Sequence, residues 1–284
     1  MSKAAEDANT YRQAARLVRE DPLLRGSTLI LPDYGQVVVT GDLHGHRRNF
    51  ERIRNYCDLE HAPVRHVILH ELIHEEPEGL DDHDMSHEVL LEAARWKVQF
   101  PEQVHFLQSN HELAQLIDQD ISKGGRIVTF SFLSGVRRTY GDDYQQVVDA
   151  MMDLVASYPL AARTANRIMI AHSLPDQGAM QFFDPAVLDR LPTLEELRDG
   201  GSAYRMVWGR YHTAAQLEDL SRLLDADIFI CGHQPQETGH EVVHGKLMIL
   251  ASDHNHGVIL PFDLKKPYGM ASLERALRPL ASIA

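Results

Sequence analysis

The chain has 284 residues, of which 44% are apolar and 24% charged, so it can bury a large core without a disulfide framework. Its 28 basic and 41 acidic side chains give a formal net charge of −13, which argues against nucleic acid as a partner because such binding needs a cationic face. The charge does not exclude a phosphorylated substrate, since bound metal ions can reverse the field at one site.

Two further features of the composition concern location and chemistry. The cysteines, Cys57 and Cys231, stand far apart, and residues 1–20 are polar and lack the apolar centre of a signal peptide. No stretch approaches the roughly 18 apolar residues of a membrane span. We therefore expect a cytoplasmic protein without membrane contact. The 17 histidines point toward metal or proton chemistry.

Short apolar segments alternate with helical patterns along the chain. The opening predicts a helix over Asn9–Glu20, and helical spacing recurs at 88–99, 143–157 and 213–224. Because strands alternate with helices early and pair as hairpins late, the pattern predicts the α/β class with mixed sheets. The predicted strands cover residues 36–40, 65–69, 104–107, 160–163, 167–171, 228–230, 247–250 and 258–262.

The domain organisation follows from what the chain lacks. It has no internal repeat and no low-complexity linker. We therefore expect one domain over residues 1–284, with an N-terminal helical extension at 1–35 and a C-terminal tail at 265–284.

Metal-binding residue types follow five of the predicted strands. In α/β sheets, functional side chains gather at the carboxyl ends of strands, where they can converge. A single histidine there is more often a hydrogen-bonded cap than a ligand, but five such strand ends are hard to explain by caps. Asp, Asn and His ligands without thiolates suit Mn, Fe or Zn ions rather than a structural zinc site. The residues are Asp42 and His44, His70 and Glu71, Asn110 and His111, His172, and His233.

Several motifs around these residues resemble one known family. The sequence Gly-Asp-Leu-His-Gly at 41–45 is similar to the GDxHG motif of calcineurin-like metallophosphoesterases, in particular the phosphoprotein-phosphatase branch. Ser-Asn-His-Glu at 109–112 and Cys-Gly-His-Gln at 231–234 resemble later motifs of that branch. The segment 160–173 looks like its hairpin ending in a ligand histidine. Together the motifs keep the family order from about residue 37 to residue 264.

The resemblance implies a sandwich of two mixed β-sheets flanked by helices, with a dinuclear metal site at the strand ends. One Mn, Fe or Zn ion would be held by Asp42, His44 and a bridging carboxylate. The second would be held by that bridge and by Asn110, His172 and His233. His111 would protonate the leaving oxygen as general acid. Asn110 and Arg210 would contact the substrate, although Arg210 is as readily explained by a surface salt bridge.

One segment departs from the family. Its GDxxDRG motif corresponds here to His-Glu-Leu-Ile-His-Glu-Glu at 70–76, so the bridging position falls to Glu71 or to its neighbour His70. His74 replaces the aspartate that orients the general acid, and Glu75 replaces an arginine that grips phosphate. Residues 71–88 contain eight carboxylates and no Lys or Arg, which predicts a solvated surface loop or, less readily, a partner site.

We therefore expect a metal-dependent phosphoesterase. It would hydrolyse phosphomonoesters, as serine/threonine phosphatases do, or a nucleotide-type phosphoanhydride, and its partner would be a phosphoprotein or a small phosphoester. The alternative is a catalytically impaired pseudophosphatase that binds metal and acts as a regulatory or scaffold protein. The retained ligands favour the enzyme, whereas the altered residues 74 and 75 favour the alternative.

Overall fold

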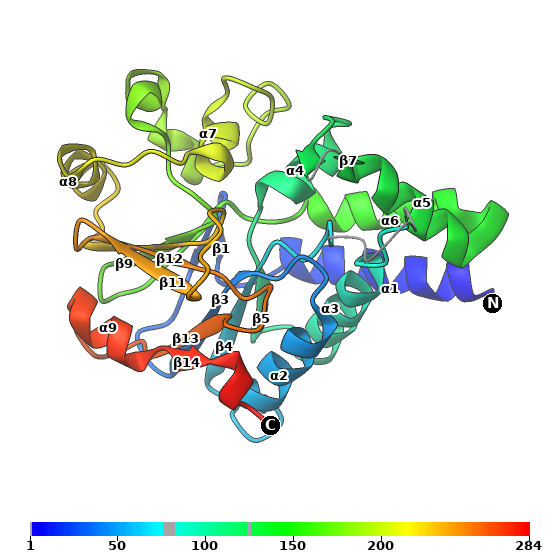
Figure 1. Cartoon of the computed structure of the whole chain (residues 1–284), viewed down its shortest axis with the longest axis horizontal. Coiled ribbons are helices and arrows are strands. Elements are labelled where there is room, and N and C mark those ends of the chain that lie inside the picture. Colours follow the sequence, from blue (N-terminus) through cyan, green and yellow to red (C-terminus); the bar gives the residue numbers. More distant parts are fainter. Residues whose placement is uncertain (1, 76–82, 124–125) are drawn as a thin grey trace.

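The computed structural model describes residues 2–75, 83–123 and 126–284, and in these residues the strands form three sheets (Figure 1). The first sheet has the order β1 (Leu24–Arg25), β2 (Thr28–Ile30), β8 (Ala161–Arg163), β9 (Ile168–Ala171), β10 (Ile228–Cys231), β12 (Leu247–Leu250) and β11 (His240–Val243). The second has the order β14 (Arg278–Pro279), β13 (Val258–Asp263), β3 (Gln36–Asp42), β4 (Arg65–His70) and β5 (Val104–Phe106). A small hairpin joins β6 (Ser122–Lys123) to β7 (Arg126–Ile127).

Both large sheets are mixed, as the sequence predicts. Strands β3, β4 and β5 are mutually parallel, whereas β13 runs antiparallel to β3. In the first sheet β10 is parallel to β9 and β12, and β8 pairs with β9 as an antiparallel hairpin. The expectation of an α/β protein with two mixed sheets is confirmed.

The two sheets face each other across an apolar core, and helices cover their outer faces. Side chains alternate along a strand, so Val37 and Val39 of β3 join the core between the sheets, whereas Val38 packs under the helices. In β9, Ile170 likewise faces the partner sheet and Met169 faces outward. The helices are α1 (Lys3–Arg19), α2 (Arg47–Cys57), α3 (His87–Gln99), α4 (Asn110–Leu116), α5 (Val128–Tyr140), α6 (Tyr144–Val155), α7 (Ser202–Trp208), α8 (Ala214–Leu223) and α9 (Met270–Ala276).

The predicted elements are found close to their expected positions, with one clear difference at the start. Helix α1 begins at Lys3 rather than Asn9, because the hydroxyl of Ser2 accepts a hydrogen bond from the Ala5 N–H and caps the first turn. The helix packs against α6 and α3, and β2 pairs in parallel with β8. Residues 1–35 are thus part of the packed structure. In the described ranges no helix is long and apolar enough to cross a membrane.

The packing of α1 can be tested at Tyr11. Its side chain is fully buried, and its hydroxyl donates to the carbonyl of His87 at 3.0 Å. Tyr11→Ala should lower the free energy of unfolding by about 3–5 kcal/mol, as removal of a buried aromatic ring does. The neighbouring exposed Arg12→Ala should change it by less than about 0.5 kcal/mol. Urea denaturation measures both values, and equal stability of the two variants would contradict the packing of α1 into the core.

Candidate metal centre

The carboxyl ends of strands from both large sheets meet at one place. Asp42 is the last residue of β3, and its backbone forms a bridge to Ala251 just after β12 of the other sheet. This close approach needs glycine on each side of the junction. A Cβ at Gly41 would lie 2.2 Å from the carbonyl oxygen of Leu250, and one at Gly232 would lie 2.1 Å from Asp42 Oδ1. Steric contact therefore explains why both motifs have glycine at these positions, Gly41 and Gly232.

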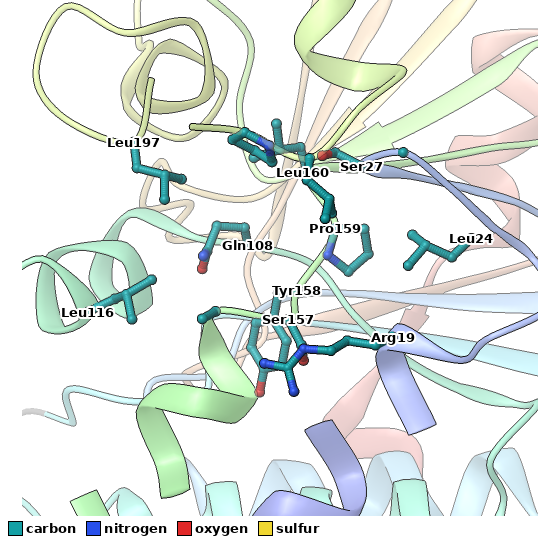
Figure 2. Close-up of a pocket in the computed structure, with 14 residues that line it drawn as sticks. Arg19, Leu24, Ser27, Gln108, Leu116, Ser157, Tyr158, Pro159, Leu160 and Leu197 are labelled. Atoms are coloured by element: carbon teal, nitrogen blue, oxygen red, sulfur yellow. The ribbon is translucent and has the colours of Figure 1, made fainter. Parts of the chain in front are cut away.

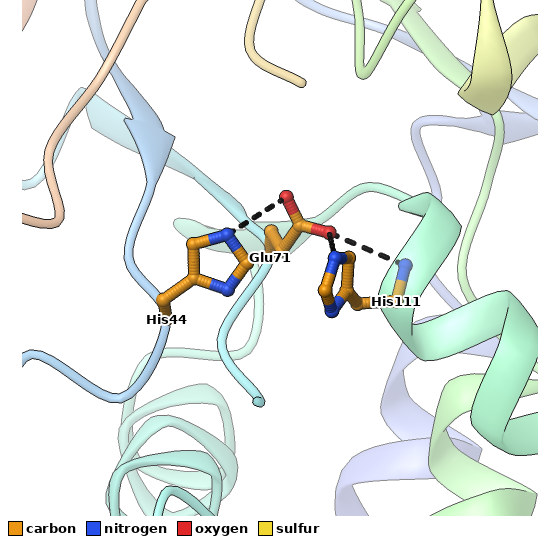
Figure 3. Close-up of side chains that lie close together, drawn as sticks. All are labelled: His44, Glu71 and His111. Carbon is orange, nitrogen blue, oxygen red and sulfur yellow. Dashed lines mark hydrogen bonds and ion pairs between the residues drawn. The ribbon is translucent and has the colours of Figure 1, made fainter. Parts of the chain in front are cut away.

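The Glu71 carboxylate lies at the centre of the cluster, between His44 and His111 (Figure 3). Its Oε2 is 3.6 Å from His44 Nε2, and its Oε1 is 3.9 Å from His111 Nε2. The backbone N–H of His111 also donates to Oε1 at 3.2 Å. His44 Nδ1 contacts the Ile73 carbonyl at 3.1 Å, which keeps the proton on Nδ1 and leaves Nε2 as a ligand atom.

A second group of potential ligand atoms lies around His172. His172 Nε2 lies 3.7 Å from Glu71 Oε2 and 2.7 Å from Asn110 Oδ1. His233 Nδ1 approaches the same Asn110 oxygen at 2.9 Å. Asp42 Oδ1 lies 3.6 Å from His172 Nδ1. The metal-capable triads are His44, Glu71 and His111, and Asp42, Glu71 and His172, so Glu71 belongs to both.

His70, the other residue considered for the bridging position, lies outside both triads. Its ring is fully buried, Nδ1 contacts the Thr40 carbonyl at 3.0 Å, and the ring centroid is 6.0 Å from that of His172. The carboxylate of Glu71, and not the imidazole of His70, is therefore the group shared between the triads. Nε2 of His70 has no hydrogen-bond partner in the described part of the chain.

Four residues in and beside the cluster have a left-handed backbone conformation, which is unfavourable for residues other than glycine. The φ angles are +41° for both His44 and Glu71, +66° for His74 and +68° for His233. Such a conformation costs about 1–2 kcal/mol per residue, and it concentrates at functional sites. Tertiary contacts maintain it here. The carbonyl of Glu71 accepts hydrogen bonds from the N–H groups of Leu43 and His44 at 2.9 and 2.8 Å, which ties two strand-end loops together.

The buried Glu112 carboxylate joins the loop after β4 to α4. Glu112 Oε1 accepts a hydrogen bond from the Leu72 N–H at 2.6 Å, and Oε2 accepts one from the Ser109 hydroxyl. Ser109 is also the N-cap of α4, the helix that begins with Asn110 and His111. Glu71 and the two α4 residues are therefore held in a fixed relation.

Burial without a compensating cation dominates the electrostatics of the cluster. It raises the pKa of Asp42 to about 7 and raises the pKa of Glu71 well above its usual range, to which the nearby Asp42 adds. Burial lowers the pKa of His233 to about 3 and that of His172 well below its usual value. The imidazoles are thus neutral, the state in which histidine binds metal.

These properties fit divalent metal ions. Asp42 Oδ1 is buried and has no hydrogen-bond partner among the described residues, although a carboxylate oxygen rarely stays unpaired. Ligand atoms about 2.0–2.2 Å from one ion lie about 3–3.5 Å apart, close to the separations of 3.6 and 3.7 Å around Glu71 Oε2. Cations between the carboxylates would also remove their mutual repulsion.

A cleft of about 270 Å³ opens above the cluster. The cleft is lined by Asp42, His44, Glu71, Asn110, His111 and His233, and by Trp208, Arg210, Ser122, Asp253 and some apolar residues. The exposed Arg210 follows α7, and its backbone N–H donates to Asp176 Oδ1 at 2.6 Å, which fixes the turn that carries it. The predicted site residues Asp42, His44, Glu71, Asn110, His111, Arg210 and His233 therefore line one cleft, whereas His172 is fully buried and contacts Asn110 Oδ1.

A second cavity, of about 300 Å³, borders the segment that leads into α4 (Figure 2). Gln108, Leu116, Tyr158 and Leu197 line it, together with other largely apolar side chains. It contains neither of the metal-capable triads, so the polar cleft is the candidate site.

The acidic segment 71–88 differs from a uniformly solvated loop at both of its ends. Glu71 and Asp84 are 2% and 1% exposed, and Asp84 accepts a hydrogen bond from the Ser86 N–H at the start of α3. Glu75 accepts one from the Met85 N–H at 2.5 Å and does not line the cleft. Glu75 therefore does not take the place of a phosphate-binding arginine. Residues 76–82 of the segment lie outside the described residues, so the predicted partner site there stays a prediction.

One residue of the site was missed at the sequence level. Gln115 lies one turn after His111 on α4, and its Oε1 is 3.0 Å from His74 Nε2. His74 Nδ1 in turn lies 2.8 Å from His111 Nδ1. The spacing His111-x-x-x-Gln115 places both side chains on one helix face, and this pattern is the signal available in the sequence.

The comparisons with known proteins concern the fold. Scans against protein-family models and curated proteins find no match to the sequence. Among solved structures, a protein serine/threonine phosphatase from Saccharomyces cerevisiae, described as similar to human phosphatase PP5, is 16% identical, with a TM-score of 0.65 over 99% of this chain and 94% of that chain. A cold-active protein tyrosine phosphatase from a psychrophilic Shewanella species is 14% identical, with a TM-score of 0.55 over 87% of this chain and 80% of that chain. The chain shares the fold of these phosphatases, in agreement with the family resemblance of its motifs.

The raised carboxyl pKa predicts how metal binding depends on pH. Without metal, the folded protein holds a proton on Asp42 up to about pH 7, whereas the unfolded chain releases it near pH 4. The metal-free fold therefore loses stability as pH rises through this range. Metal binding requires the carboxylates to be ionised, so it strengthens over the same range.

We expect the difference in Tm between Mn²⁺-loaded and metal-free protein to grow from about pH 6 to about pH 8. Asp42→Asn should reduce both the difference and its dependence on pH, and scanning calorimetry measures each. A difference that is constant or shrinks with pH would contradict the proposed ligand role of Asp42.

Proposed function

We propose that the chain is a metal-dependent phosphoesterase that hydrolyses phosphomonoesters with two divalent ions, Mn, Fe or Zn, as cofactors. One observation carries the proposal: the Glu71 carboxylate is shared by two metal-capable triads at the base of a cleft that also contains His111 and Arg210. The ligands are divided between the ions as the family resemblance implies rather than as the triads group them. They are Asp42, His44 and Glu71 for one ion, and Glu71, Asn110, His172 and His233 for the other, and His111 is left as the acid.

The chemistry requires a cation cluster and positioned protein groups. When bound, two divalent ions supply an acidified water and a clamp for the phosphoryl oxygens. Arg210 offers the substrate phosphate a guanidinium at the rim of the cleft. His111 Nε2 faces the cleft beside Glu71 and can donate a proton to the leaving oxygen. Asn110 would orient the same phosphate from the base.

The substrate class follows from the cleft and from the structures of similar fold. The cleft is about 270 Å³ in volume, and among the residues that the structure describes Arg210, at an exposed position, is the only arginine in its lining. A phosphorylated side chain of a protein, or a small phosphoester, can therefore reach it from solvent. The structures of similar fold are described as serine/threonine and tyrosine phosphatases, which supports the same class.

A nucleotide-type phosphoanhydride is a second substrate of the same chemistry, and turnover measurements with both substrates distinguish them. The absence of nucleic-acid and membrane partners and the cytoplasmic location stay predictions from composition.

The pseudophosphatase alternative gives a different result in one assay. Mn²⁺-loaded protein should hydrolyse p-nitrophenyl phosphate, and it should bind two ions per chain by plasma mass spectrometry. Two bound ions without turnover would favour a metal-binding regulatory protein, and fewer than two ions would contradict the dinuclear site.

The role of His111 can be tested by substitution with a residue that cannot supply the proton. His111→Asn should leave the metal content unchanged and lower kcat by roughly 10²–10⁴ for a substrate with a poor leaving group. The loss should be smaller for p-nitrophenyl phosphate, whose leaving group needs less protonation. His256→Asn, in an exposed loop, is the matched control. An equal loss for both substrates would exclude His111 as the acid.

Arg210 should contribute to binding more than to the chemical step. Arg210→Ala removes a charge-assisted contact to phosphate, so KM should rise by about tenfold or more while kcat changes little. Arg222→Ala, an exposed arginine paired with Asp219, serves as the control. Steady-state kinetics with p-nitrophenyl phosphate gives both constants. An unchanged KM would place Arg210 among ordinary surface residues.

A further inference from the structure

Two buried side chains, His74 and Gln115, form a chain of contacts behind the proposed general acid His111 and do not line the cleft. His111 Nδ1 lies 2.8 Å from His74 Nδ1, and His74 Nε2 lies 3.0 Å from Gln115 Oε1. His74 is fully buried and Gln115 is 5% exposed. The chain of contacts ends at the Gln115 side-chain amide, so the His74 ring lies between the His111 ring and this amide.

The acceptor at the end of this chain decides where the protons lie. An amide oxygen only accepts hydrogen bonds, so the facing His74 Nε2 must carry hydrogen. In the neutral His74 ring, Nδ1 is then unprotonated and accepts. The facing atom, His111 Nδ1, must therefore be the donor and carry hydrogen itself.

We propose that Gln115 and His74 are positioning residues that keep a proton on His111 Nδ1, so that His111 Nε2 is the nitrogen that takes a proton from water and then donates it to the leaving oxygen. This inference rests on the proposed phosphoesterase function for its catalytic meaning. His111 Nε2 is the ring atom that faces Glu71 Oε1, at 3.9 Å, on the side of the cleft.

The surroundings explain why a neutral acceptor suits this position. The buried carboxyl groups of Asp42, Glu71 and Glu112 all have raised pKa, because burial disfavours their charged forms. A further carboxylate behind His111 would add another buried negative charge, which is costly without a partner. The neutral His74 imidazole can accept the hydrogen bond from His111 Nδ1, as a carboxylate would, without adding that charge.

The relay is also held rigidly. The backbone N–H of His74 donates a hydrogen bond to the Ser86 hydroxyl at 3.0 Å. The His74 ring packs edge-on against the Phe132 ring, with the two centroids 5.5 Å apart. Gln115 and His111 are four residues apart on α4, so their separation is set by the helix itself. The ring of His74 is thus fixed between two groups of one helix.

The tautomers can be read directly by NMR, independently of activity. In Zn²⁺-loaded protein labelled with ¹⁵N-histidine, at about pH 8 where imidazoles are neutral, His74 should carry its proton on Nε2 and His111 on Nδ1. Gln115→Met removes the acceptor at similar volume and should give a mixture of tautomers at His74.

Gln119→Met is the matched control, because Gln119 lies one turn further on and contacts Tyr204 instead. It should leave both tautomers unchanged. A wild-type His74 protonated on Nδ1, or a His74 tautomer that Gln115→Met does not alter, would overturn the proposal. The remaining histidine signals report whether each variant is folded.

Kinetics then separates this inference from the proposed function. In Mn²⁺-loaded protein, Gln115→Met should lower kcat by about tenfold for phenyl phosphate and by less for p-nitrophenyl phosphate, with KM unchanged. If the wild-type protein turns over substrate and Gln115→Met turns it over equally fast, the positioning role is overturned. The predicted tautomers in a protein without turnover would overturn the phosphoesterase function alone.

Discussion

The structure depends on the burial of two carboxyl groups, Asp42 and Glu71, side by side at the ends of β3 and β4. Burial raises the pKa of both carboxyl groups, Asp42 raises that of Glu71 further, and the buried His172 imidazole beside them is neutral. Such an arrangement is unfavourable for stability alone, because buried carboxylates need compensation. Divalent ions would supply that compensation, and the left-handed backbone at His44, Glu71 and His233 aims the ligand atoms at the same place.

The departure in residues 70–76 is local and leaves the ligand arrangement intact. Glu71 reaches the position between the triads although it is one methylene longer than aspartate, because its loop is held through the Glu112 carboxylate and the backbone of His44. His74 faces His111 from the position where the family resemblance implies an orienting aspartate, and Glu75 turns away from the cleft to Met85. The replacements at positions 74 and 75 therefore change the surroundings of the proposed general acid, His111, and leave the proposed metal ligands unchanged.

The fold and most of the site could be predicted from the sequence, and the reason is physical. Apolar runs that end in Asp, His or Asn mark buried strands whose ends converge, and this places Asp42, His172 and His233 without coordinates. The direction of Glu75 and the contact between His74 and Gln115 could not be predicted. Both depend on the local backbone, which is left-handed at His74 with a φ of +66°, and this conformation is not visible in the residue type.

Anomalous diffraction at the manganese absorption edge, from crystals grown with Mn²⁺, tests most directly whether Glu71 bridges two ions. We expect two peaks about 3.5–4 Å apart, with the Glu71 carboxylate in contact with both. The peak on one side should contact Asp42 and His44, and the other should contact Asn110, His172 and His233. A single peak, or two peaks of which one does not contact Glu71, would contradict the bridging role.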